Sequence, residues 1–132
     1  MENNSNLKSL YLTLFILGII ETVLAFFIGY IIAIPVFIIA LIIKSKLPKD
    51  QPVPTGIKLM IIASSIHLLS FFFYTIFDFF MEIFFIGNNM AGIFFLIIPF
   101  FYVLITLAVF VLLIIGCIKV YGEYKNLENI VS

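Results

Sequence analysis

Hydrophobic residues fill two long stretches of the chain, which charged and turn-forming residues separate. The first stretch, 9–43, contains one ionisable residue, Glu21. A single helix over this stretch would be about 52 Å long, whereas the hydrocarbon core of a bilayer is about 30 Å thick. The Gly-Tyr pair at 29–30 offers a break, because glycine permits a tight turn and tyrosine suits the membrane interface. We therefore expect two helices, near 9–28 and 31–46.

A segment rich in lysine and proline follows, with the sequence LIIKSKLPKDQPVPTGIK. Its prolines prevent a continuous helix, so we expect a short, partly extended loop. Four lysines cluster here and are opposed only by Asp50: Lys44, Lys46, Lys49 and Lys58. Because lysine is concentrated in the cytoplasmic loops of membrane proteins, this loop is predicted to be cytoplasmic.

The second hydrophobic stretch, 59–118, is interrupted only by two acidic residues. A Gly-Asn-Asn turn signal at 87–89 divides it. The predicted helices span 57–86, as the longest extent, and 91–119. The connection between them contains no lysine and therefore belongs on the outer side of the membrane.

These segments together predict an all-α fold, an integral membrane four-helix bundle. Two helical hairpins would be joined by the cytoplasmic Lys/Pro-rich loop, and residues 1–132 would form a single transmembrane domain. We expect a multi-pass protein of the cell membrane with both termini cytoplasmic, because this orientation satisfies every charge signal.

The composition narrows the class of protein further. Of the 132 residues, 64% are hydrophobic and 11% are charged, and the mean hydropathy is +1.31. Soluble domains carry about 25% charged residues, so this chain cannot cover a water-soluble fold with polar side chains. It has no arginine and a formal net charge of zero, which excludes a basic nucleic-acid-binding face.

Glu21 lies near the middle of the first predicted helix, about 18 Å from its start. An ionisable side chain at this depth costs at least about 2.5 kcal/mol and normally faces other helices or water. Leu14, Gly18 and Ala25 share its face, and small residues allow a neighbouring helix to approach closely. Two interpretations stay open. Glu21 is a proton or cation site, or its carboxyl forms a hydrogen bond that serves helix packing, which is the favoured one.

The third predicted helix carries a stripe of polar and aromatic residues. A helical projection places within about 100° of one another Ser64, His67, Phe71, Tyr74, Thr75, Asp78 and Glu82. This one-sided pattern predicts that Ser64, His67 and Tyr74 face other helices or a cavity. Ser64, Ser65 and His67 of this helix, and Thr106 of the fourth predicted helix, are candidate hydrogen-bond partners of Glu21. We favour the third helix, because its polar stripe also needs an interior face. A buried Glu–His pair could relay protons, but a histidine that serves packing is favoured.

Asp78 and Glu82 form an i,i+4 pair of carboxylates near the outer end of the same helix. Like charges at this spacing repel each other, and water at the membrane interface relieves most of that cost. A hard cation would need six or more oxygen ligands, of which two carboxylates supply few. We therefore favour a solvated face over a metal site.

The sequence contains no catalytic constellation and no signature of a cofactor or metal site. It has one histidine, no cysteine beside it, no phosphate-binding loop and no nucleophile motif. We expect a non-enzymatic accessory, regulatory or immunity-type membrane protein. Its expected partners are the lipid bilayer and either another membrane protein or a second copy of the chain.

The alternative is a small proton- or cation-coupled transporter that uses Glu21. Length, topology and the single carboxyl of the first helix are similar to those of the small multidrug resistance exporters, and the segment LGIIETVLAF resembles the corresponding part of that family. The chain departs from the family in its Lys/Pro-rich loop and its lack of tryptophan. The resemblance implies that Glu21 would couple proton movement to export.

Overall fold

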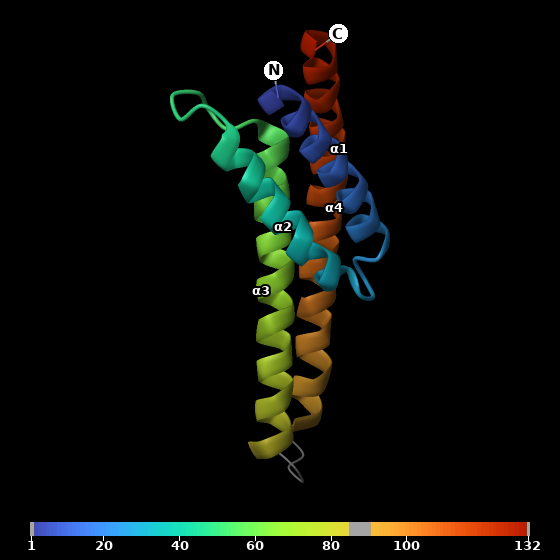
Figure 1. The fold of residues 1–132 in the computed structure, drawn as a ribbon. Coiled ribbons are helices and arrows are strands. Elements are labelled where there is room, and N and C mark those ends of the chain that lie inside the picture. Colours follow the sequence, from blue (N-terminus) through green and yellow to red (C-terminus); the bar gives the residue numbers. More distant parts are fainter. Residues whose placement is uncertain (1, 85–90, 132) are drawn as a thin grey trace.

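The computed structural model describes residues 2–84 and 91–131 of the chain. Four helices, and no strand among these residues, make up the fold: α1 (Glu2–Val23), α2 (Gly29–Lys46), α3 (Thr55–Phe84) and α4 (Ala91–Val131) (Figure 1). Each helix contains a segment long and apolar enough to cross a membrane. The predicted all-α architecture with four helices is confirmed, and the chain is a multi-pass membrane protein.

The break between the first two helices does not lie at 29–30, where the sequence placed it. α1 already ends at Val23, the turn occupies 24–28, and Gly29 begins α2. The Phe27 and Gly29 amides donate to the carbonyl of Leu24, at 2.9 and 2.8 Å. All five turn residues are apolar, so nothing in the side-chain pattern marks the turn. Further backbone hydrogen bonds join the turn to the end of α1, from Leu24 to Ile20 and from Ala25 to Thr22. A turn in an apolar environment requires such internal bonding.

α4 is longer than the predicted 91–119 and continues to Val131. The polar tail stays helical because it packs on the bundle: Tyr124 and Leu127 lie against the core. Glu123 accepts a hydrogen bond from the Gly56 amide at the start of α3, at 2.7 Å. A carboxylate in this position satisfies an amide that has no partner within its own helix.

The same kind of packing extends α1 at its amino end. The sequence predicted a start near residue 9, whereas α1 begins at Glu2. Leu7 lies against the core, and the Lys8 ammonium lies 4.0 Å from the Glu128 carboxylate of α4. The charged ends of α1 and α4 therefore support each other as helices.

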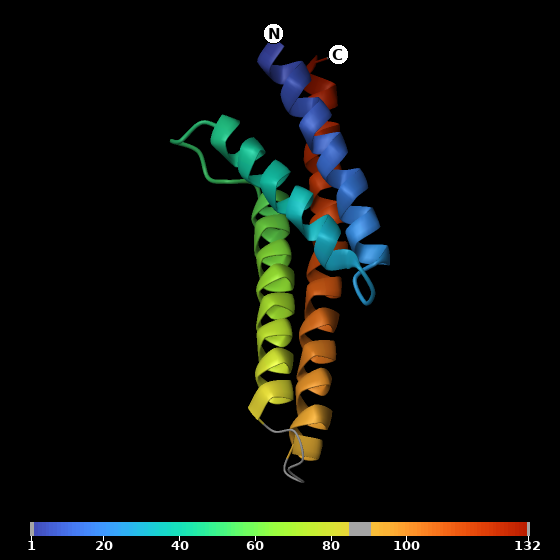
Figure 2. The same ribbon diagram turned by 60° about the horizontal axis from the view of Figure 1, so that its bottom comes forward.

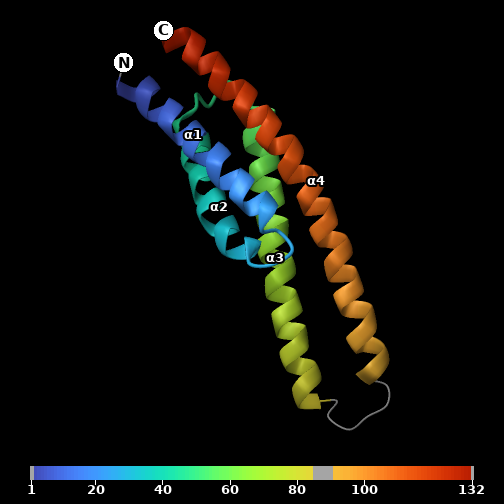
Figure 3. The same cartoon turned by 90° about the vertical axis from the view of Figure 1, so that its right-hand side faces the viewer.

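The helices pack as two hairpins of unequal length. α1 packs on α4 and α2 packs on α3, so α1 and α3 lie diagonally across the bundle (Figures 2 and 3). The α1–α2 turn stops partway along the longer hairpin, and the rest of α3 and α4 projects beyond it (Figure 1). The position of the α1–α2 turn along α3 is fixed by a contact near the start of α2, where Tyr30 stacks on Phe71 of α3 with ring centroids 3.7 Å apart.

The core occupies the part of the bundle where all four helices meet. Its buried hydrophobic residues include Tyr11, Leu14, Ile57, Met60 and Leu113, each at most 2% exposed. The outer faces are also hydrophobic, with Leu96 77% and Phe27 76% exposed. Apolar side chains on both the inside and the outside are what a bilayer-embedded bundle requires, because lipid tails are as apolar as leucine.

Gly18 provides a test of the packing of α1. A Cβ at this position would lie 2.6 Å from Met60 Cε and 3.0 Å from Cys117 Sγ, whereas one at Gly92 would meet nothing within 4 Å. We expect Gly18→Leu to lower the free energy of unfolding by about 1–3 kcal/mol through overpacking. Thermal stability in one detergent measures the effect, with Gly92→Leu as the control. If both variants melt like the parent, α1 is not packed as described.

Candidate functional site

A cluster of three polar side chains lies inside the bundle, at the level of the α1–α2 turn. Oε1 of Glu21 lies 2.9 Å from Nδ1 of His67, and the Ser64 hydroxyl donates to the other carboxyl oxygen at 3.3 Å. All three residues have no exposed surface. We refer to Glu21, Ser64 and His67 as the polar cluster.

The three residues meet because each lies on the buried face of its helix. Leu14, Gly18 and Glu21 of α1 and Ala25 of the following turn are all buried, as the sequence led us to expect. Ser64 lies one turn before His67 on α3 and reaches the same carboxyl group. Glu21 belongs to the α1–α2 hairpin, whereas Ser64 and His67 belong to the α3–α4 hairpin. These hydrogen bonds therefore connect the two hairpins across the bundle.

The pairing satisfies most of the polar atoms in the cluster. Both carboxyl oxygens of Glu21 have a partner, and the ring of His67 uses Nδ1. A proton on Nδ1, or one on the carboxyl group, maintains the bond, so the cluster can hold a proton at either end. In an interior of low dielectric constant such a bond is stronger than in water.

Nε2 of His67 is the exception. It is buried and has no hydrogen-bond partner among the described residues. The ring is held closely, since a Cβ at Gly29 would lie only 2.9 Å from Cε1 of His67 and 2.8 Å from the Leu24 carbonyl oxygen. Gly29 is therefore required by the close approach of α2 to this ring, and the ring presents one unused polar atom.

The rest of the predicted stripe divides into two groups. Tyr74 is half-buried and faces α4, with its ring 4.9 Å from that of Tyr102. The inward orientation expected for Ser64, His67 and Tyr74 is therefore confirmed. Asp78 and Glu82 are exposed, and the structure does not bring them to Glu21 or His67.

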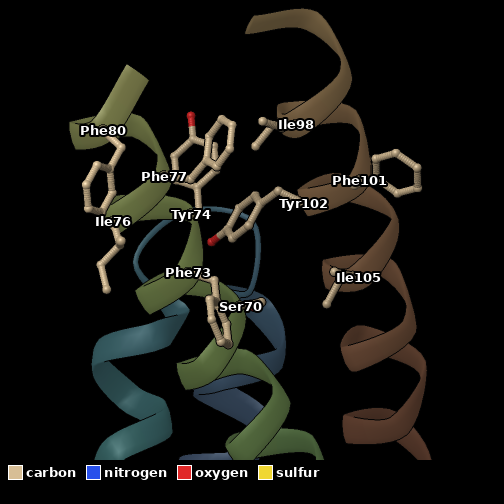
Figure 4. Close-up of a pocket in the computed structure, with 10 residues that line it drawn as sticks. All are labelled: Ser70, Phe73, Tyr74, Ile76, Phe77, Phe80, Ile98, Phe101, Tyr102 and Ile105. Carbon is tan, nitrogen blue, oxygen red and sulfur yellow. The ribbon is translucent and has the colours of Figure 1, made fainter. Parts of the chain in front are cut away.

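A cavity of about 390 Å³ lies between α3 and α4, in the part of the hairpin beyond the α1–α2 turn. Tyr74 and Phe77 of α3 and Ile98 and Tyr102 of α4 point into the space between the two helices (Figure 4). Ser70 lines its inner end and donates a hydrogen bond to the His67 carbonyl oxygen at 2.9 Å. Volumes of this size are typical of sites that bind small molecules.

Sequence reasoning did not identify this cavity or the contact made by the half-buried Glu123. Thr106 is 1% exposed, but its hydroxyl donates to the Tyr102 carbonyl oxygen of its own helix rather than to Glu21. The predicted fourth helix ends at 119, which leaves Glu123 in the cytoplasmic tail. Its position on the same helical face as Val120 and Leu127 was the available signal.

The described residues contain no group of three or more His, Cys, Asp or Glu side chains that could hold a metal ion. The polar cluster offers one carboxylate and one imidazole, which is fewer than the ligands of a stable metal site. The arrangement is suited to hydrogen bonding and proton binding.

Comparisons with known proteins give no relative. No protein-family model matches the chain, and neither a curated protein nor a solved structure matches it. The resemblance of residues 17–26 to small multidrug resistance exporters is not extended by these comparisons.

The polar cluster predicts a specific order of mutant stabilities. We expect His67→Leu to lower the free energy of unfolding by about 3–5 kcal/mol, because Glu21 is left buried without its main partner. Ser64→Ala should cost only about 0.6–2 kcal/mol, the range of single interhelical hydrogen bonds in membranes. Glu21→Gln keeps an acceptor and a donor and should be tolerated.

A double variant separates pairing from packing. Glu21→Leu with His67→Leu replaces the whole pair by apolar groups and should be more stable than His67→Leu alone. Unfolding in a mixed-detergent titration measures the parent, the three single variants and the double variant. A double variant less stable than the single one would contradict the pairing.

Proposed function

We propose that the protein is a non-enzymatic accessory, regulatory or immunity-type membrane protein that acts by binding another membrane component. The partner is another membrane protein or a second copy of this chain. The observation that carries this proposal is the uncovered α3–α4 cavity, where α1 and α2 do not reach.

Two features support association in this region. The cavity is lined by aromatic side chains of two facing helices, and its wall extends onto exposed phenylalanines such as Phe73 and Phe80. Interhelical association in a bilayer depends on close packing, for which a preformed recess offers a specific shape. The polar cluster supports the same proposal, because both oxygens of Glu21 are used for internal hydrogen bonds.

A proton- or cation-coupled transporter that uses Glu21 is the second candidate. It is favoured by Nε2 of His67, which is buried without a partner among the described residues. Ionisable groups inside membrane proteins commonly mark proton pathways. Transport would require the Glu21–His67 bond to open and close, whereas the accessory function requires it to persist.

Photocrosslinking combined with one substitution distinguishes the two functions. A photoreactive amino acid at Phe77, which lines the cavity, should give a discrete protein adduct in intact membranes. The same amino acid at Phe79, which is 60% exposed and does not line this cavity, should give none. Glu21→Gln should preserve the adduct and the fold.

The transporter function predicts the opposite behaviour. Proton-coupled flux in vesicles would be abolished by Glu21→Gln, because the amide cannot carry the proton. Flux in the parent that disappears in this variant would overturn the accessory proposal. Equal crosslinking at Phe77 and Phe79 would show that the cavity is not a specific binding site, and it would contradict the accessory proposal.

We further propose that both termini and the 47–54 loop lie in the cytoplasm, with the chain in the cell membrane. The amino end of α1, the carboxyl end of α4 and this loop lie at one end of the bundle (Figure 1). The concentration of lysine in and around the loop supports the cytoplasmic assignment.

Reporter fusions test this orientation. A fusion at Asp50 or at Val131 should report a cytoplasmic location. One at Asn89, in the predicted α3–α4 connection outside the described residues, should report an external one. A fusion at Asp50 that reports an external location would reverse the assignment.

A further inference from the structure

Two adjacent cavities surround Lys44, at the end of the bundle opposite the α3–α4 cavity. The larger, about 390 Å³, lies between the end of α2 and the loop, and Lys44 and Lys49 line it. The smaller, about 140 Å³, lies between Lys44, Lys58 and α3. Val53 lines both, so the loop folds back between the two cavities.

These cavities are basic and the charge is not neutralised within the described part of the chain. None of the three lysines takes part in the ion pairs that the structure records, whereas Lys8 and Lys125 both pair with Glu128. Asp50, the only acidic residue of the loop, lines neither cavity. Gln51 adds an amide to the larger one, and Ser45, whose hydroxyl donates to the Ile42 carbonyl oxygen at 2.7 Å, adds a hydrogen-bond acceptor.

The same cavities are continuous with the apolar outer face of the bundle. Leu41 of α2 lines the larger cavity and is 39% exposed, and Ile62 of α3 lines the smaller one and is 48% exposed. The site thus combines lysines near the loop with apolar side chains further along α2 and α3. This is the order of chemical groups along a phospholipid, from phosphate to acyl chains.

We propose that this site, formed by Lys44, Lys49 and Lys58, binds an anionic phospholipid. The ammonium groups meet the phosphate, Ser45 and Gln51 meet the polar head group, and the acyl chains lie against Leu41 and Ile62. Basic pockets between membrane helices bind anionic head groups in this way. The proposal is independent of the partner proposed for the α3–α4 cavity, because the two sites lie at opposite ends of the bundle.

Native mass spectrometry of the full chain in mild detergent tests the binding. The probes are phosphatidylglycerol and phosphatidylcholine with identical acyl chains, which differ in net charge. We expect the parent to retain phosphatidylglycerol preferentially and to lose this preference as ionic strength rises. Lys44→Gln with Lys49→Gln should weaken retention roughly 25-fold, or about fivefold for each lysine.

Two control variants separate a pocket from general surface charge. Lys119→Gln with Lys125→Gln changes the net charge equally but lies outside the site, and it should retain phosphatidylglycerol like the parent. Lys46→Gln changes a lysine of the same helix end that lines neither cavity, and it should also have no effect. The thermal stability of each variant confirms that it is folded.

The outcomes decide the proposal. Equal retention of the two lipids, or equal loss in the control variants, would overturn it in favour of diffuse attraction. Inorganic phosphate serves as a probe without chains and should not displace the lipid at equal concentration. If it does, the site binds a free anion and the lipid proposal is wrong.

Discussion

The structure depends on the cost of holding Glu21 and His67 in an environment without water. Neither side chain has exposed surface, and their polar atoms lie 2.9 Å apart. Each group is tolerable at this depth only because the other helix supplies its partner. The pairing also fixes the register of the two hairpins, since moving either residue by one position would rotate its side chain by about 100°. Elsewhere among the described residues the interior is mostly apolar, and the buried Thr106 hydroxyl bonds within its own helix rather than across the bundle.

This constraint is also what made the interior predictable from sequence. A polar side chain in a membrane helix has few acceptable positions, so the stripe from Ser64 to Tyr74 and the face around Glu21 pointed to the bundle interior. Depth along the helices left candidate partners of Glu21 on both α3 and α4, and the polar stripe of α3 decided between them. The functional meaning of the pair did not follow, because a packing bond and a proton site use the same atoms.

The ends of helices could not be predicted where hydrophobic residues continue without a polar or turn-forming residue. The turn at 24–28 consists of apolar residues, and its existence depends on backbone hydrogen bonds to Leu24 rather than on side chains. The opposite problem affected the end of α4, where a polar segment resembles a solvated tail. Its helix is stabilised by tertiary contacts, above all that of Glu123 with the Gly56 amide, and no local propensity reports such contacts.

The bundle therefore has two parts with different physical characters. Towards the termini, four helices enclose a packed core, buried polar atoms are mostly paired, and charges gather at the surface. Beyond the α1–α2 turn, two helices remain, and their aromatic side chains line an open cavity. Exposing apolar surface in that second part costs little in a bilayer, because lipid replaces protein with similar contacts. Specific association there must therefore arise from shape, and the recess between Tyr74 and Tyr102 is the feature of the hairpin that provides it.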